Sequence, residues 1–169
     1  MHVEQLTSLL KAWGVDYKRY QHPPLDTCDE ADALQLQRSG TRLKNLFLKD
    51  NYGRRHFLLL TTPEKRVDLK LLSKQMSIAR LGFASERRLL KYLKVKPGCV
   101  SLLALINDEQ QQVELLLDND IVDSEYFQCH PLINTETYVL SHHNIDKFLA
   151  NTGHTVKSVL VPEINESKG

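Results

Sequence analysis

The sequence is poor in cysteine and has no long apolar run. Its 169 residues include three cysteines, Cys28, Cys99 and Cys129, and no two of them form a Cys-x-x-Cys pair. This argues against a disulfide scaffold and favours a reduced, cytoplasmic protein. No segment approaches the roughly 20 apolar residues of a membrane span, and the N-terminus lacks the basic-then-apolar pattern of a signal peptide. We therefore expect no membrane partner.

The motifs of common cofactor and nucleophile sites are also missing. There is no P-loop and no Gly-x-Gly-x-x-Gly, so no nucleotide cofactor is expected. There is no Gly-x-Ser-x-Gly elbow. The seven histidines form no His-x-x-x-His pair, and no cysteine pair accompanies them, so no metal site is expected either. Cys99 follows a Pro-Gly turn and has the place of a nucleophile, although a lone cysteine is more often a small buried hydrophobe.

The composition is that of an ordinary globular domain, with 41% hydrophobic and 25% charged residues. We expect a single domain over residues 1–162 and a flexible tail over 163–169. Apolar spacing and capping residues predict helices over 3–13, 27–37 and 85–93, a short one starting near Asp68, and one from Ser141 to Gly153. Alternating or apolar runs predict strands at 16–21, 42–49, 56–62, 80–83, 100–106, 113–117, 126–129, 138–140 and 156–161. The turn at 107–109 predicts that strands 100–106 and 113–117 pair as a hairpin, and Leu89, Leu90 and Leu93 are expected to face inward from the helix over 85–93. Hairpins mixed with crossover helices indicate an α+β fold with a mixed, mostly antiparallel sheet.

Charge is segregated along the chain. Residues 38–96 hold 16 basic and four acidic side chains, a net charge of +12, whereas the remaining residues have a net charge of −11. Such segregation allows a basic face that attracts polyanions. The alternative is that folding intermixes the two halves and the charges are only solvated.

Lys44 and Asn45 begin an apolar strand. Side chains alternate between the faces of a strand, so Lys44 shares one face with Leu46 and Leu48, and Asn45 shares the other face with Phe47. Both faces are apolar beyond Asn45, as in a central strand. The lysine and the amide either point into a cleft, or Lys44 extends from the end of the sheet into solvent.

Two further segments could line a site. The glycine-bearing loop Pro97-Gly98-Cys99-Val100-Ser101 could present backbone N–H groups to an anion or oxyanion. Residues 130–137 place His130, Asn134 and two threonines between apolar strands. They are either polar lining for a site or a loop whose side chains bond to its own backbone.

Together these segments resemble the YbaK/ProX family of aminoacyl-tRNA deacylases, and most of all its PrdX-like branch, freestanding relatives of the editing domain of bacterial prolyl-tRNA synthetases. The resemblance runs in family order from about residue 3 to 153. The matching stretches are His22-Pro23-Pro24, Lys44-Asn45-Leu46-Phe47-Leu48-Lys49-Asp50, Arg66-Val67-Asp68-Leu69-Lys70, Leu81-Gly82-Phe83-Ala84, Pro97-Gly98, Leu105-Ile106-Asn107-Asp108 and His130-Pro131 with Asn134-Thr135 and Thr137.

The resemblance implies a barrel-like sheet flanked by helices and hydrolysis of the ester that joins a wrong amino acid to tRNA. In this branch the usual substrate is alanine on tRNA(Pro). It implies that Lys44 contacts the terminal nucleotide and holds the ester, and that His130 closes the pocket. It implies neither a protein nucleophile nor a metal, because the ribose hydroxyl of the substrate helps to position water. The implied substrate-binding residues are Asn45, Gly98, Cys99, Val100, Ser101, Leu102, His130, Asn134 and Thr135.

The sequence departs from the family at the glycine loop, where Leu102 takes the place of a usual proline, and at Asp26, where relatives often carry an apolar residue. The amino acid removed is therefore left open, with cysteine on the same tRNA as an alternative to alanine. A tRNA- or synthetase-binding module without catalysis is the alternative of another class. The expected partners are the acceptor end of tRNA and prolyl-tRNA synthetase. The expected tRNA contacts are Arg80, Arg87, Arg88 and Lys91, with a competing patch at Lys65, Arg66, Lys70 and Lys74.

Overall fold

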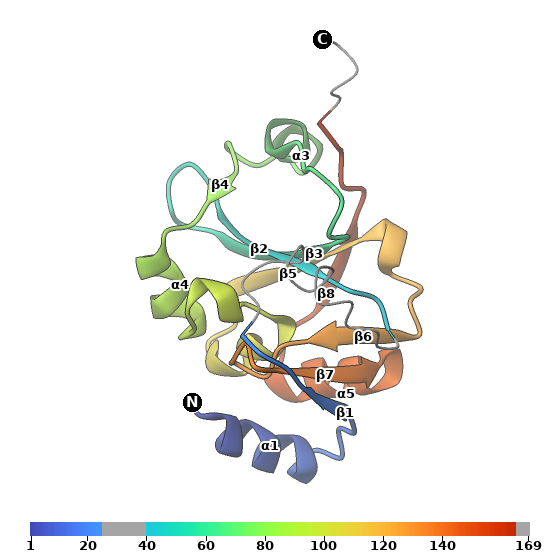
Figure 1. Cartoon of the computed structure of the whole chain (residues 1–169). Coiled ribbons are helices and arrows are strands. Elements are labelled where there is room, and N and C mark those ends of the chain that lie inside the picture. The colour runs from blue at the N-terminus through green and yellow to red at the C-terminus, as the bar shows by residue number, and fades with distance from the viewer. Residues whose placement is uncertain (25–39, 165–169) are drawn as a thin grey trace.

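The chain forms an α+β fold around a central five-stranded sheet (Figure 1). The computed structural model describes residues 1–24 and 40–164. The helices are α1 (Val3–Ala12), α3 (Leu69–Gln75), α4 (Glu86–Leu93) and α5 (His142–Thr152), with 3-10 turns η1 (Pro97–Cys99), η2 (Leu102–Asn107) and η3 (Asn119–Ile121). The strands are β1 (Lys18–Gln21), β2 (Lys44–Lys49), β3 (His56–Thr61), β4 (Gly82–Phe83), β5 (Val113–Asp118), β6 (Tyr126–Cys129), β7 (Glu136–Ser141) and β8 (Val156–Val159).

The strands form two sheets. The larger has the order β4-β2-β3-β5-β8, in which β2 is antiparallel to β3 and β4, while β5 is parallel to β3 and β8. The smaller is antiparallel, with the order β1-β7-β6. A bridge from Thr41 to Phe127 joins the segment before β2 to the smaller sheet. The expected α+β class with a mixed sheet is confirmed, and within the described residues the strands form two sheets without closing into a barrel.

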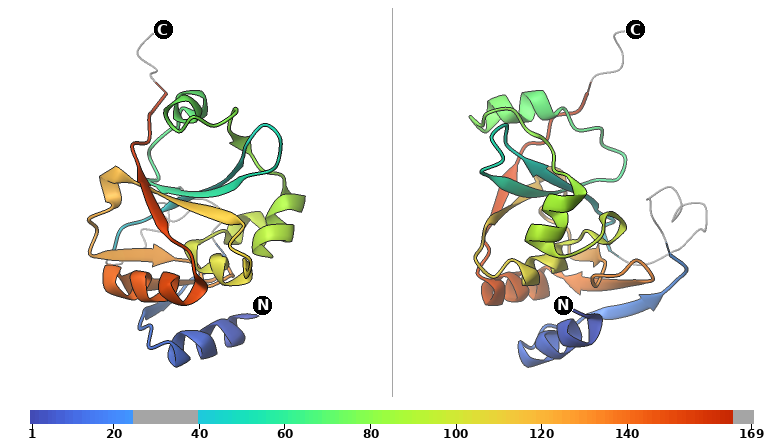
Figure 2. Two further views of the ribbon diagram at one scale, coloured as in Figure 1. Left: turned by 180° about the vertical axis from the view of Figure 1, so that it is seen from behind. Right: turned by 90° about the vertical axis from the view of Figure 1, so that its left-hand side faces the viewer.

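Two apolar cores lie on opposite faces of the larger sheet. The alternation along β3 shows this directly, because Leu58 and Leu60 enter one core and Phe57 and Leu59 the other. The first core also contains side chains of α1, α4, α5 and η2, and the second is covered by α3. Figure 2 shows α3 on one side of the sheet, and α1 and α5 on the other. β2 and β3 are therefore central strands, as the two apolar faces of the Lys44 strand predict.

Capping residues begin the helices where the sequence predicts. The side chains of Asp68, Ser85 and Ser141 accept hydrogen bonds from backbone N–H groups of the first turns of α3, α4 and α5. Gly153 ends α5 in the left-handed conformation. Along the described part of the chain, no helix combines the length and apolar character that crossing a membrane requires.

Two sequence predictions are wrong. Residues 100–106 are not a strand, because Leu102–Asn107 forms the 3-10 turn η2, and β5 pairs in parallel with β3 instead of closing a hairpin with this segment. Leu90, predicted to face inward on α4, is 62% exposed. The predicted helix over 27–37, Asp26 and residues 165–169 lie outside the described residues.

Candidate active site

Lys44 stands at the first position of β2, opposite Thr61 of β3. Its side chain is half-buried, and its ammonium Nζ donates a hydrogen bond to the backbone carbonyl of Lys65 at 2.9 Å. A carbonyl is a neutral acceptor, and it uses one of the three hydrogens of the ammonium. The contact thus orients the Lys44 side chain without placing an anion against it.

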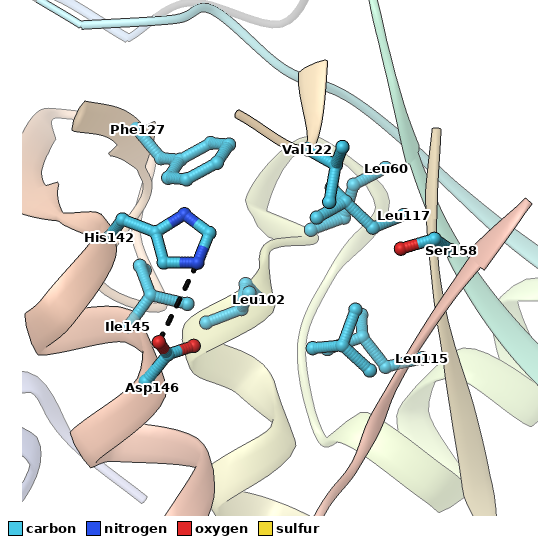
Figure 3. A pocket seen from close by; sticks show the side chains of 11 residues that line it. Leu60, Leu102, Leu115, Leu117, Val122, Phe127, His142, Ile145, Asp146 and Ser158 are labelled. Atoms are coloured by element: carbon cyan, nitrogen blue, oxygen red, sulfur yellow. Dashed lines mark ion pairs between the residues drawn. The ribbon is translucent and has the colours of Figure 1, made fainter. Parts of the chain in front are cut away.

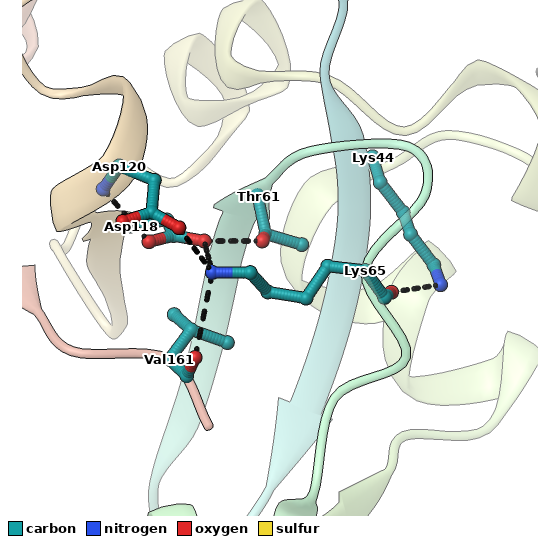
Figure 4. Close-up of polar contacts among 6 residues, drawn as sticks. All are labelled: Lys44, Thr61, Lys65, Asp118, Asp120 and Val161. Carbon is teal, nitrogen blue, oxygen red and sulfur yellow. Dashed lines mark hydrogen bonds and ion pairs between the residues drawn. The ribbon is translucent and has the colours of Figure 1, made fainter. Parts of the chain in front are cut away.

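The residue that holds Lys44 belongs to a buried ion pair that the sequence did not indicate. Lys65 is 5% exposed, and its Nζ lies 2.8 Å from carboxylate oxygens of both Asp118 and Asp120 (Figure 4). Asp118, at the end of β5, is fully buried and also accepts a hydrogen bond from the hydroxyl of Thr61 at 2.6 Å. Lys65 and Asp118 are 53 residues apart in the sequence, so no local motif predicts that they pair. The sequence placed Lys65 in a surface patch, which its burial contradicts.

The two partners shift the pKa of each other in opposite directions. Burial by itself would raise the pKa of Asp118, but hydrogen bonds from Lys65 and Thr61 outweigh burial and lower it below the usual carboxyl value. Burial would likewise lower the pKa of Lys65, and its hydrogen bonds to Asp118 and Asp120 raise it instead. Both groups are therefore charged at neutral pH.

Asn45 lies on the opposite face of β2, as predicted. It pairs with Leu60, whose side chain enters the core that contains η2. The side-chain oxygen of Asn45 is buried and has no hydrogen-bond partner. An unsatisfied buried acceptor costs about 1–3 kcal/mol, so it marks a position where a ligand donor would be stabilised.

The glycine loop and the histidine segment contact each other. Ser101, which is buried, donates from its hydroxyl to the backbone carbonyl of His130 at 2.6 Å and accepts from the N–H of Leu103 at 3.0 Å. Gly98 and Cys99 form the turn η1, in which the Cys99 N–H donates to the carbonyl of Lys96. Ser101 thus joins two segments that the sequence could only place separately.

His130 lies beside a second histidine. The ring centroids of His22 and His130 are 6.4 Å apart, with the rings edge to face. His22 is buried, and its Nε2 shares a hydrogen bond with the hydroxyl of Thr137 at 2.9 Å. The Nδ1 of His130 lies 3.3 Å from the backbone carbonyl of Glu136. Sequence reasoning used His22 in a matching stretch without assigning it a place in the site.

Asn134 and Thr135 lie in the same loop, and both are half-buried. The carbonyl of Thr135 accepts a hydrogen bond from the N–H of His22 at 3.0 Å, which fastens the loop to the end of β1. Within the segment, the side chain of His130 contacts the segment's own backbone at Glu136, as one interpretation of the sequence held, while the His130 carbonyl is bonded to Ser101 of the glycine loop.

Leu102 faces the interior. It is 4% exposed and lines an apolar cavity of about 200 Å³ between α5 and strands β5 and β8 (Figure 3). Val100 is also buried, at 9% exposed. The polar edge of the cavity carries His142 and Asp146, with the His142 Nε2 3.6 Å from the Asp146 carboxylate. Where relatives carry proline, this chain therefore places an apolar side chain in the core.

The four expected tRNA contacts divide between two surfaces. Arg87 and Lys91 are exposed on α4, whereas Arg88 donates hydrogen bonds to the Gly53 carbonyl at 3.2 Å and to His56 Nε2 at 3.0 Å. Arg80 lies away from them. It lines a groove of about 770 Å³ together with Lys70 and Lys74 of α3.

Across residues 1–24 and 40–164, no three His, Cys, Asp or Glu side chains are grouped so that they could hold a metal ion. The thiol of Cys129 is buried, which raises its pKa to about 12, and Cys99 is half-buried.

The chain is similar to known proteins over most of its length. The model of the aminoacyl-tRNA editing domain matches residues 22–148. The prolyl-tRNA editing protein ProX of Acetoanaerobium sticklandii is 35% identical over 145 residues, which cover 86% of this chain and 88% of that protein. The prolyl-tRNA synthetase associated domain-containing protein 1 of Danio rerio is 33% identical over 154 residues, which cover 90% and 83%.

A solved structure described as a candidate trans-editing enzyme for prolyl tRNA synthetase has the same fold. It superposes with a TM-score of 0.67 at 17% identity and covers 96% of this chain and 97% of that one. The hypothetical protein APE2540 superposes with a TM-score of 0.69 at 16% identity. The expectation of an aminoacyl-tRNA deacylase is confirmed by the family match and the identity to ProX. The chain belongs to the aminoacyl-tRNA editing domain family.

Proposed function

We propose that this chain acts in trans on tRNA(Pro) carrying a wrong amino acid, and that alanine is the amino acid it removes. The observation that carries the proposal is the 35% identity to a prolyl-tRNA editing protein over most of both chains. We further propose that residues 1–162 act as a single editing domain.

The proposed chemistry needs positioning more than a protein nucleophile. An aminoacyl ester is already reactive, so orientation and stabilisation of the developing oxyanion can supply much of the rate. In this scheme the Lys44 ammonium contacts the terminal nucleotide and holds the ester, while the backbone of Gly98–Leu102 faces the aminoacyl group. Water attacks the ester carbonyl carbon with help from the neighbouring ribose hydroxyl of the substrate. The bond from that carbon to the esterified ribose oxygen then breaks, this oxygen takes a proton from the attacking water, and the amino acid is released as the free acid from the intact tRNA.

Three further groups support this scheme. The buried oxygen of Asn45 offers an acceptor to the donors of an aminoacyl ester, its α-ammonium and ribose hydroxyl groups. His130 closes the pocket, since Ser101 fixes it against the glycine loop. Asn134 and Thr135 supply polar lining from the same segment.

The test is hydrolysis of defined esters. tRNA(Pro) charged with alanine, cysteine or proline is incubated with the protein, and the loss of each ester is followed against a blank. We expect rapid loss of alanine and retention of proline. Faster loss of cysteine would move the specificity to the alternative substrate, and loss of proline would contradict an editing role.

A module that binds tRNA or the synthetase without catalysis is the second candidate. It is favoured by Leu102, because proline at this position would fix the loop backbone and leucine does not. Such a module would bind tRNA(Pro) or prolyl-tRNA synthetase and leave all three esters intact.

A further inference from the structure

We propose that the buried ion pair between Lys65 and Asp118 is a positioning device for Lys44. The inference rests on the proposed function, in which Lys44 holds the ester. Lys65 takes part in both contacts. The side chain of Lys65 binds Asp118, and its backbone carbonyl accepts the hydrogen bond of Lys44 (Figure 4).

The side-chain end of Lys65 is fully engaged. Its ammonium contacts the Asp118 and Asp120 carboxylates, each at 2.8 Å, and lies 3.4 Å from the carbonyl of Val161. Asp118 is itself fixed at the end of a buried strand by the Thr61 hydroxyl. Lys65 therefore has one position relative to the central sheet.

The backbone carbonyl of Lys65 in turn sets the position of the Lys44 ammonium. The segment from Thr62 to Asp68 connects β3 to α3. Within it the Lys65 N–H donates to the Thr62 carbonyl, and after Lys65 the Arg66 carbonyl accepts from the Ile164 N–H and the Asp68 N–H donates to the Pro162 carbonyl. Between these points, the ion pair fixes where the Lys65 carbonyl lies. Without the ion pair, the backbone contacts on either side would still hold Thr62, Arg66 and Val67, and we expect the Lys65 carbonyl between them to shift relative to Lys44.

The arrangement also leaves the charge of Lys44 available to substrate. A carboxylate in the place of the carbonyl would neutralise the ammonium, whereas a carbonyl only orients it. The buried carboxylate of Asp118 is already paired with Lys65. A buried ion pair adds little net stability compared with apolar residues of similar volume, so stability alone does not account for this one.

The test removes both charges together. Lys65→Met with Asp118→Asn leaves no unpaired buried charge, and the new amide can still accept from Thr61. We expect kcat for ester hydrolysis to fall about 100-fold, the scale of a 1 Å misplacement, with KM for tRNA unchanged. A matched control is Asp108→Asn with His154→Gln, a buried pair at 2.8 Å just before β5 begins. The control should lose stability and keep the wild-type kcat.

A second readout does not depend on activity. In protein labelled with ¹⁵N-lysine, the Nζ signal assigned by its loss in Lys44→Arg should be visible in the wild type and exchange-broadened in the double variant. Should the double variant not fold, Asp118→Asn alone leaves Asp120 to balance Lys65 and should move both readouts in the same direction.

The outcomes separate the two proposals. If the wild type leaves every ester intact, the proposed function fails, and the lysine spectra still decide the positioning role. If the wild type hydrolyses the ester and Lys44→Ala does not, while the double variant keeps its kcat and its Lys44 signal, the positioning role is overturned and the proposed function stands.

Discussion

At the scale of single residues, Lys44 is notable for its neutral partner. A surface lysine usually pairs with a carboxylate or extends into water, whereas this one donates to a backbone carbonyl. The ammonium is oriented but not neutralised, which suits contact with a phosphate or an ester oxygen.

Lys44→Ala should therefore reduce kcat by about 100-fold or more, the usual scale for losing one preorganised electrostatic group. The fold should persist, because the lost hydrogen bond is worth about 1 kcal/mol. Lys44→Arg should fail as well, since a planar fork does not replace a compact ammonium. The measurement is single-turnover hydrolysis of Ala-tRNA(Pro) alongside thermal melting. Lys157→Ala, an exposed lysine of β8, is the control, and a fully active Lys44→Ala of unchanged Tm would remove Lys44 from the site.

The thiols should be dispensable. Burial raises the pKa of Cys129 to about 12, so it carries almost no thiolate at neutral pH and should resist iodoacetamide. Hydrolysis should also survive a metal chelator. Inhibition by chelator that zinc reverses would contradict this expectation. Inhibition by alkylation that disappears in Cys99→Ala would show that an adduct on the glycine loop blocks the pocket.

The sequence predicted Lys44 but not its support. The alternation around Lys44 and Asn45 is a local property of one strand, and it placed both side chains on the correct faces. The Lys65–Asp118 pair depends on two distant strand ends meeting, and a lysine within a basic segment gives no sign of burial.

At the scale of elements, capped helices and alternating strands were predicted well because their signals are local. The strand prediction for residues 100–106 is wrong for a physical reason. Leu102, Leu103, Ala104, Leu105 and Ile106 are all buried, so the apolar run had no period to distinguish a strand from a helical turn. The predicted hairpin between residues 100–106 and 113–117 is wrong for the same reason, because a hairpin needs a strand before the turn. In the structure β5 pairs in parallel with β3 instead.

The helix α4 and the groove beside α3 are competing candidates for the tRNA surface. If α4 makes the contacts, Arg87→Glu with Lys91→Glu should weaken tRNA binding and flatten its salt dependence. Fewer phosphate contacts then form on binding, so fewer counterions are released. Hydrolysis at saturating tRNA should be unchanged. Binding titrations over a salt series measure this.

Lys70→Glu with Lys74→Glu is the matched variant for the groove, and a larger effect there would move the tRNA surface to α3. Arg88 is left in place, because it bonds to Gly53 and His56 and its loss would disturb the β2–β3 turn. If both variants bind tRNA as tightly as the wild type, the charges of the basic segment are only solvated and do not contact tRNA.

At the scale of the whole molecule, the charge asymmetry is partly balanced by ion pairs between the two halves, one exposed and one buried. Arg55 pairs with Glu114, and Lys65 pairs with Asp118 and Asp120, so cations of the basic segment meet acids from beyond it. Folding thus intermixes some charges, as one reading of the composition held, and still leaves exposed cations on α3 and α4.

The buried carboxylates predict how stability depends on pH. Burial would raise the pKa values of Asp118 and Asp108, but their hydrogen bonds, from Lys65 and Thr61 and from His154, lower both. A lowered pKa gives stability that is complete above the unfolded value, about 4, and is lost as pH falls through the folded value. The raised pKa of Lys65 gives stability that is complete below its unfolded value, about 10.4, and is lost as pH rises through the folded value. The contribution of these groups to the free energy of unfolding should therefore be constant between about pH 4 and about pH 10.4 and should fall below pH 4.

Urea unfolding over a pH series tests this, with the Lys65→Met, Asp118→Asn variant as comparison. Removing Asp118 as an acid removes up to one proton taken up on unfolding below pH 4, so the slope of stability against pH should be shallower by up to about 1.4 kcal/mol per pH unit. The Asp108→Asn, His154→Gln variant should lose a similar part of the slope, and its effect should add to the first because the two pairs lie at opposite ends of β5. An acid slope that is identical in wild type and both variants would show that these carboxylates titrate alike in the folded and unfolded chain.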